Sequence, residues 1–373
     1  MKIFVTGATG FVGSAVVQEL KSAGHQVLGL VRSEANARSL ATTGAEVHRG
    51  SLEDADSLRR GVEASDGVIH TAYNHDFINV TREAAAEADK CVIDILGAAL
   101  EGSGRPLVIT SGIGHLANGR VLTETDVPDP SPGSVRVIAE RAALSLATRG
   151  VRPTVVRLSP SVHGDGDHAF IPMLIGIARQ KGVSAYLGEG RNRWPAVHRL
   201  DAARLFRLAL ERGTAGSTFH GVADEGIPTR EIAETIGRRL NVPVVSLSPE
   251  DAAQHFSWLA RFLAVDAPAS SARTQERLGW YPREPGLLAD LKHGRYFEGG
   301  ALLPDRHRAP VCPEGPLRMR PLPERTASAW RCRAPHQLPP GSMMTRGRAG
   351  RQRPAAARRR RRRRRAADER DTS

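Results

Sequence analysis

The sequence predicts an α/β fold in which a doubly wound parallel sheet is followed by a smaller α/β lobe. Short, nearly continuous apolar runs alternate with amphipathic stretches throughout the first 160 residues. Such runs are typical of parallel strands that are covered by helices on both faces. A glycine-rich turn stands between the first apolar run and the first amphipathic stretch. Because crossover connections are right-handed, the pattern predicts a doubly wound sheet of the Rossmann type.

The expected strands and helices follow one another in a regular order. The apolar run 2–6 leads into the turn GATG, and the amphipathic stretch after that turn ends at Gly24, a residue type that often ends helices. The alternation then continues to residue 159. The expected strands are 2–6, 26–31, 45–50, 66–72, 106–111 and 153–159, and the expected helices are 11–23, 34–42, 54–62, 79–101 and 134–148.

Beyond residue 160 the alternation becomes less regular, which indicates a smaller lobe whose late segments return to the main sheet. The segment 190–195 holds two arginines and a tryptophan, and it is expected to be either a loop that contacts an anionic or polar substrate or an exposed loop without that role. The expected division is a first domain at 1–160, the lobe at 161–297 and a tail at 298–373. In the lobe we expect helices at 169–181, 201–212, 229–240 and 249–264, and strands near 184–187, 217–222 and 243–247.

The positive charge of the chain lies in its last 73 residues. The formal net charge is +13, but residues 301–373 carry 20 arginines against six acidic residues, while the other 300 residues carry 33 basic against 34 acidic. Eight consecutive arginines occupy 358–365, and like charges at that density predict disorder. We expect no nucleic-acid binding from the folded part. The tail is either an electrostatic tether to an anionic partner or, as we favour, an extension without function.

Several classes of protein are excluded. The sequence has no run of about 18 apolar residues, so no transmembrane helix and no membrane partner are expected. The first residues leave no room for the apolar region of a signal peptide. The three cysteines show no metal-ligand spacing, so no metal site is expected and a cytoplasmic location is favoured.

The turn after the first strand carries the sequence TGATGFVG, which is typical of a dinucleotide site. Gly7 permits a sharp turn, Gly10 lets the backbone approach a pyrophosphate, and Gly13 lets the helix pack closely on the strand. The start of the following helix presents free N–H groups to the phosphates. The alternative is a glycine-rich turn without a ligand. The expected cofactor contacts here are Gly7, Thr9, Gly10, Phe11, Val12 and Gly13.

The end of the second strand favours NADP(H), with NAD as the alternative. An acidic residue at this point commonly binds the ribose 2′-hydroxyl of NAD, whereas an arginine accommodates a 2′-phosphate. This chain has Arg32 and Ser33 there. A guanidinium can form two hydrogen bonds to a phosphate. Alternatively, Arg32 is a solvated residue that pairs with Glu34.

With these motifs the sequence resembles the short-chain dehydrogenase/reductase superfamily, in its extended and atypical NAD(P)-dependent epimerase/dehydratase branch. The resemblance covers about residues 1–297 and rests on TGATGFVG, RGSLEDADSL, GVIHTA, LVITSG, VVRLSPSVHGDGD and VHRLDAA. In the last motif, His198 and Asp201 are expected to be structural. The resemblance implies that Ser51 and Leu52 flank the adenine, that Ala72 and Tyr73 line the ribose side, and that Leu158, Ser159 and Pro160 lie beside the nicotinamide.

The chain departs from that family at its catalytic motif. Family members place Tyr and Lys in a YxxxK motif on the helix after the fifth strand, but here Pro132 and Arg136 occupy those positions. Arg136 can hydrogen-bond the ribose or polarise a substrate oxygen, although it cannot act as a general base. The alternative is an exposed pair with Glu140 on a helix whose buried stripe is Val135, Ile138, Ala142 and Leu146.

Other side chains near the expected cleft are candidates for catalysis. Ser111 is expected to hydrogen-bond a substrate carbonyl or the nicotinamide amide, or else to cap the strand end. The family's catalytic hydroxyl often lies one position later, where this chain has Gly112. Histidine titrates near neutrality and suits proton transfer. We favour His163 facing the substrate over a metal site in HGDGDH; the candidate proton donors are Tyr73, His75, His115 and His163.

The leading hypothesis is an NAD(P)-dependent oxidoreductase that acts on the CH–OH or carbonyl group of a small molecule. Hydride transfer requires mainly positioning and polarisation of the carbonyl, so the loss of a tyrosine slows the reaction without abolishing it. The alternatives are a catalytically silent NADP(H) sensor and a sugar-nucleotide epimerase or dehydratase. The resemblance also implies a homodimer through the helices 79–101 and 134–148.

Overall fold

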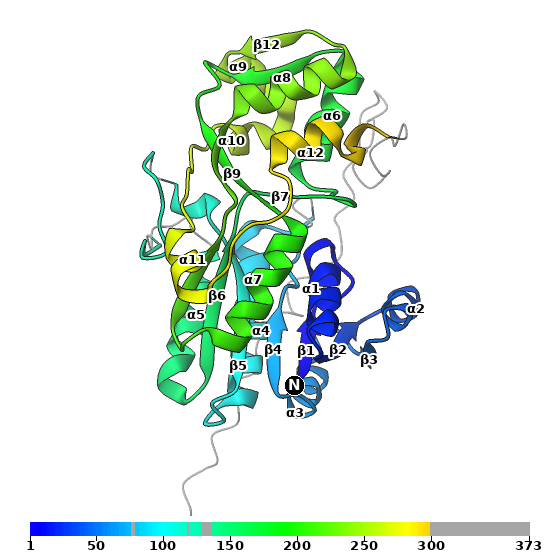
Figure 1. The fold of residues 1–373 in the computed structure, drawn as a ribbon, viewed down its shortest axis with the longest axis vertical. Coiled ribbons are helices and arrows are strands. Elements are labelled where there is room, and N and C mark those ends of the chain that lie inside the picture. The colour runs from blue at the N-terminus through cyan, green and yellow to red at the C-terminus, as the bar shows by residue number, and fades with distance from the viewer. Residues whose placement is uncertain (76–78, 118, 129–135, 299–373) are drawn as a thin grey trace, which may run out of the picture. The chain divides into compact units, whose positions relative to one another are not determined.

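The computed structural model describes residues 1–75, 79–117, 119–128 and 136–298, which all belong to one compact unit. Its centre is a seven-stranded parallel sheet with the order β10-β6-β5-β4-β1-β2-β3 (Figure 1). The predicted α/β class and parallel sheet are therefore confirmed. The strands are β1 (Lys2–Thr6), β2 (Gln26–Val31), β3 (Glu46–Arg49), β4 (Gly67–His70), β5 (Pro106–Gly112), β6 (Arg152–Leu158) and β10 (Ser217–Gly221).

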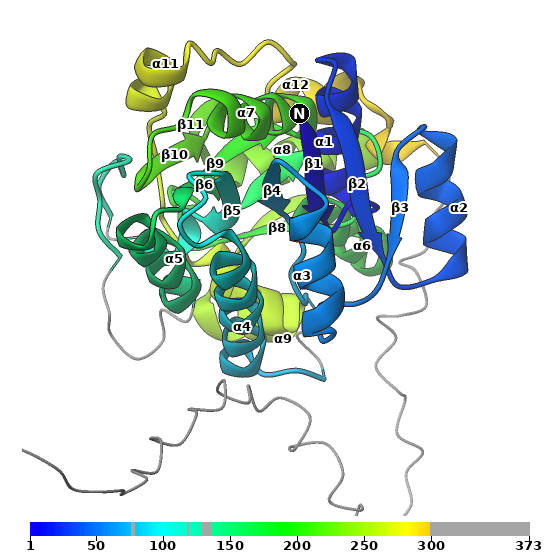
Figure 2. The same ribbon diagram turned by 90° about the horizontal axis from the view of Figure 1, so that it is seen from below.

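Helices cover both faces of this sheet, as Figure 2 shows in a view along the strands. Alternate residues of the strands point to opposite faces, so that Ile3 and Val5 lie in one hydrophobic core and Phe4 lies in the other. The first core contains side chains of α1 (Phe11–Ser22), α2 (Glu34–Thr42) and α7 (Arg199–Arg212). The second contains side chains of α3 (Ala55–Glu63), α4 (Arg82–Leu100) and α5 (Arg136–Ser145).

The strand order reverses between β1 and β4. From β1 the chain runs outward through β2 and β3, and it then returns to place β4 on the other side of β1. In doubly wound sheets a ligand binds in the crevice at the carboxyl ends of the strands at such a reversal. The glycine-rich turn follows β1, and Tyr73 follows β4. The topology therefore brings two of the predicted cofactor segments to the same edge.

The second half of the chain forms two small sheets and returns one strand, β10, to the main sheet, where it pairs with β6. This return agrees with the expectation from the sequence. The small sheets contain β7 (Ser161–His163), β9 (Arg193–His198) and β11 (Asp224–Pro228), and β8 (Ser184–Leu187) with β12 (Val244–Leu247). The helices are α6 (Phe170–Lys181), α8 (Thr229–Leu240), α9 (Pro249–Phe256), α10 (Ala260–Leu263), α11 (Ala272–Leu278) and α12 (Leu287–His293).

Two expectations for this lobe are wrong. The segment expected as a substrate-contacting loop runs into β9, and Trp194 is 1% exposed in the core of the lobe. The single helix expected at 249–264 is interrupted at Ser257, whose positive φ of 53° does not belong to a right-handed helix. Both errors arise because burial and backbone breaks in this lobe depend on contacts between distant segments.

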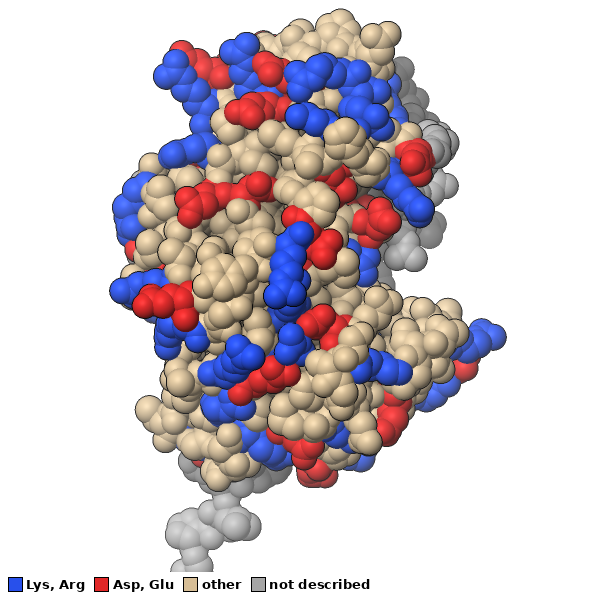
Figure 3. Space-filling model, in the orientation of Figure 1, with Lys and Arg blue, Asp and Glu red and all other residues tan. Residues whose placement is uncertain are grey.

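The arginine-rich tail and its predicted disorder lie outside the described residues. Within the described part, no helix is long and apolar enough to cross a membrane. Figure 3 shows basic and acidic side chains interspersed on the face in view.

Candidate functional site

The glycine-rich turn between β1 and α1 is packed so closely that side chains have no room in it. A Cβ atom at Gly13 would lie 2.0 Å from the carbonyl oxygen of Gly7, and one at Gly7 would lie 2.7 Å from the backbone nitrogen of Ala72. Gly7 also has a φ of +71°, which favours glycine. Gly10 caps α1 without a side chain, so the first turn of the helix presents its N–H groups beside Thr9, Phe11 and Val12.

A buried chain of hydrogen bonds fixes the ends of β1 and β4 relative to each other. The Thr6 hydroxyl lies 2.6 Å from Nδ1 of His70, and Nε2 of the same ring lies 2.9 Å from Oδ1 of Asp89 on α4. All three side chains are buried. Sequence reasoning missed this chain because its members are far apart along the sequence and show no recognisable motif. It orders the backbone on which Gly7 and Ala72 lie.

The end of β2 leaves a cation without an acidic partner. The carboxylate of Glu34 pairs with Arg49 of β3 at 2.5 Å, and Arg32 makes no ion pair with any described residue. The suggested pair between Arg32 and Glu34 is therefore absent from the described residues. The Ser33 hydroxyl caps α2 by accepting a hydrogen bond from the backbone N–H of Asn36. The Ser33 hydroxyl therefore has a structural role as the N-cap of α2, which does not depend on a cofactor.

Two further predicted positions follow β3 at the same edge of the sheet. Ser51 is partly buried, and Leu52 packs against the second hydrophobic core. Both residues follow β3 at the carboxyl edge of the sheet, and the family resemblance implies that the adenine binds there.

After β4, the ring of Tyr73 makes a cation–π contact with an arginine. The guanidinium of Arg136, at the start of α5, lies 3.7 Å from the centre of this ring. The ring of His75 meets the same tyrosine edge-on at 5.0 Å. A guanidinium over an aromatic face is held by the ring quadrupole. The structure thus brings together two predicted residues, one for the cofactor and one for catalysis.

The alternative reading of the α5 helix is wrong. Glu140 is wholly buried and binds Arg157 of β6, whose Nε lies 3.1 and 3.2 Å from the two carboxylate oxygens, so Glu140 does not form an exposed pair with Arg136. Ile138 is 41% exposed rather than buried. The helix turns a polar side chain inward because a buried arginine on the neighbouring strand requires a carboxylate. Pro132 and Val135 lie outside the described residues.

At the end of β5, two buried polar atoms have no hydrogen-bond partner among the residues that the structure describes. Ser111 is 3% exposed, and its Oγ is unpartnered, as is Nε2 of His115 in the short helix η1 (Gly114–Leu116). Burial lowers the pKa of His115 to about 4, so its ring is neutral at neutral pH. Ser111 therefore does not cap the strand with its hydroxyl. Unpartnered buried polar atoms at this edge fit a site that a ligand completes.

After β6, Ser159 and Pro160 hold the edge of the crevice. The Ser159 hydroxyl donates to the carbonyl oxygen of Gly221 at the end of β10, at 2.7 Å. Cγ of Pro160 lies 3.7 Å from the position that a Cβ atom would take at Gly114. These two residues therefore lie between β10 and the helix that carries His115.

His163 is placed in a different group of side chains. It is fully buried, and its Nδ1 lies 2.8 Å from a carboxylate oxygen of Asp290 on α12. Its ring meets that of His198 at 5.3 Å, and its Nε2 has no hydrogen-bond partner. These contacts come from the smaller lobe rather than from Tyr73, Ser111 or Arg136. The catalytic role of His163 stays a prediction.

His198 and Asp201 are structural, as expected. His198 is the N-cap of α7 and accepts a hydrogen bond from the backbone N–H of Leu200. Asp201 accepts hydrogen bonds from the backbone N–H groups of Arg283 and Glu284, at 3.0 to 3.1 Å.

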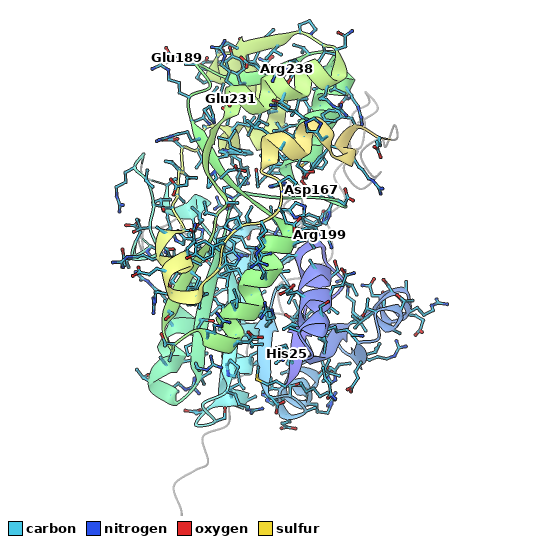
Figure 4. The ribbon with its side chains drawn as sticks, in the orientation of Figure 1. His25, Asp167, Glu189, Arg199, Glu231 and Arg238 are labelled. Carbon is cyan, nitrogen blue, oxygen red and sulfur yellow. The ribbon has the colours of Figure 1, made fainter. Side chains whose placement is uncertain are left out.

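One arginine that the sequence analysis did not select touches the glycine-rich turn. Arg199 lies at the start of α7, where Figure 4 shows it beside the start of α1. Its guanidinium lies 4.8 Å from the centre of the Phe11 ring and donates a hydrogen bond to the Ser14 hydroxyl. The ring of His168 meets Phe11 edge-on at 5.8 Å. The sequence offered one indication of this role: Arg199 directly follows His198 in the VHRLDAA motif.

The HGDGDH segment forms hydrogen bonds to an aromatic residue. Asp167 accepts a hydrogen bond from the Tyr296 hydroxyl at 2.8 Å, and the same hydroxyl accepts one from the backbone N–H of Gly164. Among the residues that the structure describes, no group of three or more His, Cys, Asp or Glu side chains could hold a metal ion.

Comparison with known proteins gives concordant results. A model of the family described as "NAD dependent epimerase/dehydratase family" matches residues 3–220. An uncharacterised protein of Schizosaccharomyces pombe is 53% identical over 80% of this chain and 100% of its own length. An uncharacterised protein of Saccharomyces cerevisiae is 45% identical over 78% of this chain and 98% of its own length.

More distant relatives have names that state an activity. A 4-hydroxy-2-methyl-3-oxo-4-farnesyl-3,4-dihydroquinoline-1-oxide ketoreductase of Stigmatella aurantiaca is 28% identical over 72% of this chain and 84% of its own. Among solved structures, the dTDP-glucose 4,6-dehydratase DesIV of Streptomyces venezuelae, with NAD and TYD bound, has a TM-score of 0.65. It is 20% identical over 80% of this chain and 97% of its own, a likeness that concerns the fold.

Proposed function

We propose that this chain, which belongs to the NAD-dependent epimerase/dehydratase family, is an NADP(H)-dependent oxidoreductase acting on the CH–OH or carbonyl group of a small molecule. The observation that carries the proposal is the backbone packing at the carboxyl ends of β1 and β4. There a glycine-rich turn too tight for side chains meets the open start of α1, at the carboxyl edge of a parallel sheet. Such an edge binds a dinucleotide diphosphate through backbone N–H groups.

Preference for NADP(H) is supported by the charges at the end of β2. Arg32 is exposed and has no acidic partner among the described residues, while Glu34 is neutralised by Arg49. A 2′-phosphate would therefore meet a free guanidinium. The distinguishing measurement is calorimetric titration of the purified protein with NADPH and with NADH. Tighter binding of NADH would overturn the NADP(H) assignment, and binding of neither nucleotide would overturn the whole proposal.

The matched variants for this measurement are Arg32→Asp and Arg38→Asp. Arg38 is also exposed, but it lies within α2 rather than at the end of β2. We expect Arg32→Asp to weaken NADPH binding by at least about tenfold, because a charge-assisted contact is lost, and to strengthen NADH binding, because the new carboxylate can bind the ribose 2′-hydroxyl. The Arg38 variant should bind both nucleotides like the native protein. Equal losses in the two variants would indicate a general effect of surface charge.

Arg136 would act on the bound ligands as a fixed cation. Its position over Tyr73 places it at the crevice, and it makes no ion pair with another described residue. A dihydronicotinamide, when bound, supplies the hydride for carbonyl reduction. The guanidinium can hydrogen-bond the cofactor ribose or a substrate oxygen, but it has no proton to exchange near neutral pH. Positioning and polarisation are therefore the contributions that we assign to it.

Turnover is the direct test. NADPH oxidation would be followed at 340 nm with aldehydes, ketones and sugar nucleotides, for the native protein and for Arg136→Ala. The ketoreductase activity in the name of the relative from Stigmatella aurantiaca supports ketones as the first group to test. We expect the substitution to lower kcat/KM by about tenfold to a hundredfold, as for loss of a charged hydrogen bond. Unaltered turnover would remove Arg136 from the assignment.

Two alternatives would appear as distinct outcomes. Tight NADPH binding without turnover of any compound would favour a catalytically silent sensor, which the replacement of the family's tyrosine by Pro132 makes plausible on chemical grounds. Turnover of a sugar nucleotide without net oxidation of NADPH would favour an epimerase or dehydratase.

A further inference from the structure

The unpartnered side chains at the end of β5 lie where the family's catalytic hydroxyl is missing. We propose that the His115 imidazole and the Ser111 hydroxyl together bind the carbonyl oxygen of the substrate, and so replace the hydrogen bonds that tyrosine and serine supply in related enzymes. This inference rests on the proposed oxidoreductase function and adds the groups that hold the reacting oxygen.

The first argument is position. A Cβ atom built on Gly112 would lie 3.8 Å from Nδ1 and from Cε1 of the His115 ring. The resemblance to the family places its catalytic hydroxyl at Gly112, so the imidazole lies beside the space that this hydroxyl would fill. The helix that carries His115 also packs near Pro160, at the edge implied for the nicotinamide.

The second argument is unmet hydrogen bonding. Oγ of Ser111 and Nε2 of His115 are both buried atoms without a partner among the described residues. Leaving a buried polar atom unpaired costs about 1–3 kcal/mol, and most buried polar groups in native proteins are hydrogen-bonded. A ligand oxygen in the crevice would accept a hydrogen bond from either group. The two residues are therefore better explained by a site than by the packing of the fold.

The third argument is charge. The ionisable groups that face His115 are Arg136 and Glu140 on α5, Arg157 on β6 and Arg82 on α4. Glu140 and Arg157 bind each other, so the two other arginines leave an excess of positive charge. Burial and these arginines keep the imidazole neutral. A neutral imidazole still donates one hydrogen bond, and it does so without adding a further positive charge to the site.

Reduction of the carbonyl group requires one hydride and one proton, and water supplies the proton. The carbonyl carbon accepts the hydride, the π electron pair moves onto the oxygen, and the oxygen takes a proton from water. The negative charge that develops on the oxygen is stabilised by N–H and O–H donors already in place, which is the arrangement that lowers such a barrier. The imidazole ends the reaction in the protonation state in which it began.

The test uses the full chain and three carbonyl probes: 4-nitrobenzaldehyde, cyclohexanone and butane-2,3-dione. His115→Leu removes the donor, His115→Gln keeps an amide donor, and Ser111→Ala removes the hydroxyl. His255→Gln is the matched control, because its imidazole is also half-buried with an unpartnered Nε2 but lies on α9 of the smaller lobe. Thermal melting and NADPH affinity are measured for every variant.

We expect His115→Leu to lower kcat by about 100-fold to 1000-fold, with the dissociation constant for NADPH within twofold of the native value. His115→Gln should recover part of the loss, and Ser111→Ala should lower kcat by about tenfold or more. His255→Gln should be as active as the native protein. A purely packing role would instead lower the melting temperature of both His115 variants equally, without recovery by the amide.

The outcomes separate the inference from the proposed function. If the native protein reduces a probe and His115→Leu reduces it equally well, the inference fails and the function stands. If the native protein binds NADPH but reduces none of the probes, both fail. A second readout is the NMR titration of the His115 ring, which should show a pKa about 4; titration near 6.5 would overturn the neutral-imidazole role.

Discussion

At the scale of single residues, the absence of a side chain at Gly13 is the feature on which the cofactor site depends. Its backbone lies against Gly7, and a Cβ atom would approach the Gly7 carbonyl oxygen to 2.0 Å. A backbone atom cannot move aside as a flexible side chain can. The turn and the helix must therefore separate to admit even a methyl group.

We expect Gly13→Ala to lower the free energy of unfolding by about 1–3 kcal/mol and to abolish measurable NADPH binding. Urea unfolding and calorimetry would check the two effects. Gly24→Ala is the control, since its Cβ would meet nothing within 4 Å and only its φ of +83° is unfavourable. The control should lose about 1 kcal/mol of stability and bind NADPH normally. Normal binding by Gly13→Ala would contradict the assigned role of the turn.

Several histidines with a lowered pKa make the stability of the protein depend on pH, among them His75, whose pKa burial lowers to about 4. Burial lowers the pKa of His115 to about 4 and also lowers the pKa of His220, which is fully buried on β10. The unfolded chain therefore binds more protons than the folded chain between the ordinary histidine pKa of about 6.5 and the folded pKa values. Stability must fall as the pH falls through this window.

Between pH 7.5 and pH 5.5 we expect protonation linked to His115 to lower the free energy of unfolding by about 1 kcal/mol, with further losses from the other histidines whose pKa is lowered. Urea unfolding at a series of pH values would measure the loss. His115→Gln should remove the contribution of His115 and leave that of the other histidines, because glutamine does not titrate. Stability that stayed constant, or rose, as the pH decreased would contradict the burial of these rings.

At the scale of elements, a buried ion pair joins α5 to the sheet. Arg157 of β6 and Glu140 of α5 are 2% and 0% exposed, and Arg157 also donates to the carbonyl oxygen of Asp126 at 2.9 Å. The pair thus ties the helix that begins at Arg136 to the strand beside β5. Removing one partner leaves the other as an unpaired buried charge.

We expect Glu140→Gln to lower the free energy of unfolding by about 3–5 kcal/mol. Glu101→Gln is the matched control, because it breaks an exposed pair with Arg149 and should change the stability far less than Glu140→Gln does. Chemical unfolding of both variants at pH 7 makes the comparison. Similar small losses in the two variants would show that the buried pair does not hold α5 in place.

At the scale of the whole molecule, the folded part and the arginine-rich tail differ in charge and composition. The Schizosaccharomyces pombe relative matches 80% of this chain over its own entire length, so it has no counterpart to the remaining fifth. Residues 301–373 carry the positive excess, and the other 300 residues are close to neutral. The cytoplasmic location and the homodimer through α4 and α5 stay predictions.

Deletion of residues 301–373 should leave the melting temperature within about 2 °C and the NADPH affinity within twofold. The shortened chain should also lose any retention on a heparin column, because electrostatic binding to polyanions follows the number of available cations. Differential scanning calorimetry, calorimetric titration and chromatography would test the three statements. A large fall in stability or NADPH affinity would show that the tail takes part in the fold.

The sequence by itself determined the parallel sheet, the order of its first six strands and the glycine-rich turn. These features follow from local patterns: apolar runs, helix periodicity and the conformational freedom of glycine at Gly7 and Gly13. The end of the fifth strand indicated Ser111 as a candidate, and the family resemblance indicated Tyr73 and Arg136; their functional roles stay predictions.

Only the tertiary structure decided which partners these residues have. The pairing of Glu140 with Arg157, the stacking of Arg136 on Tyr73 and the unpartnered atoms of Ser111 and His115 all depend on segments that are distant in the sequence. The return of β10 to the main sheet and the burial of Trp194 have the same origin. Burial and hydrogen-bond satisfaction are properties of the packed chain, so a periodic pattern cannot specify them.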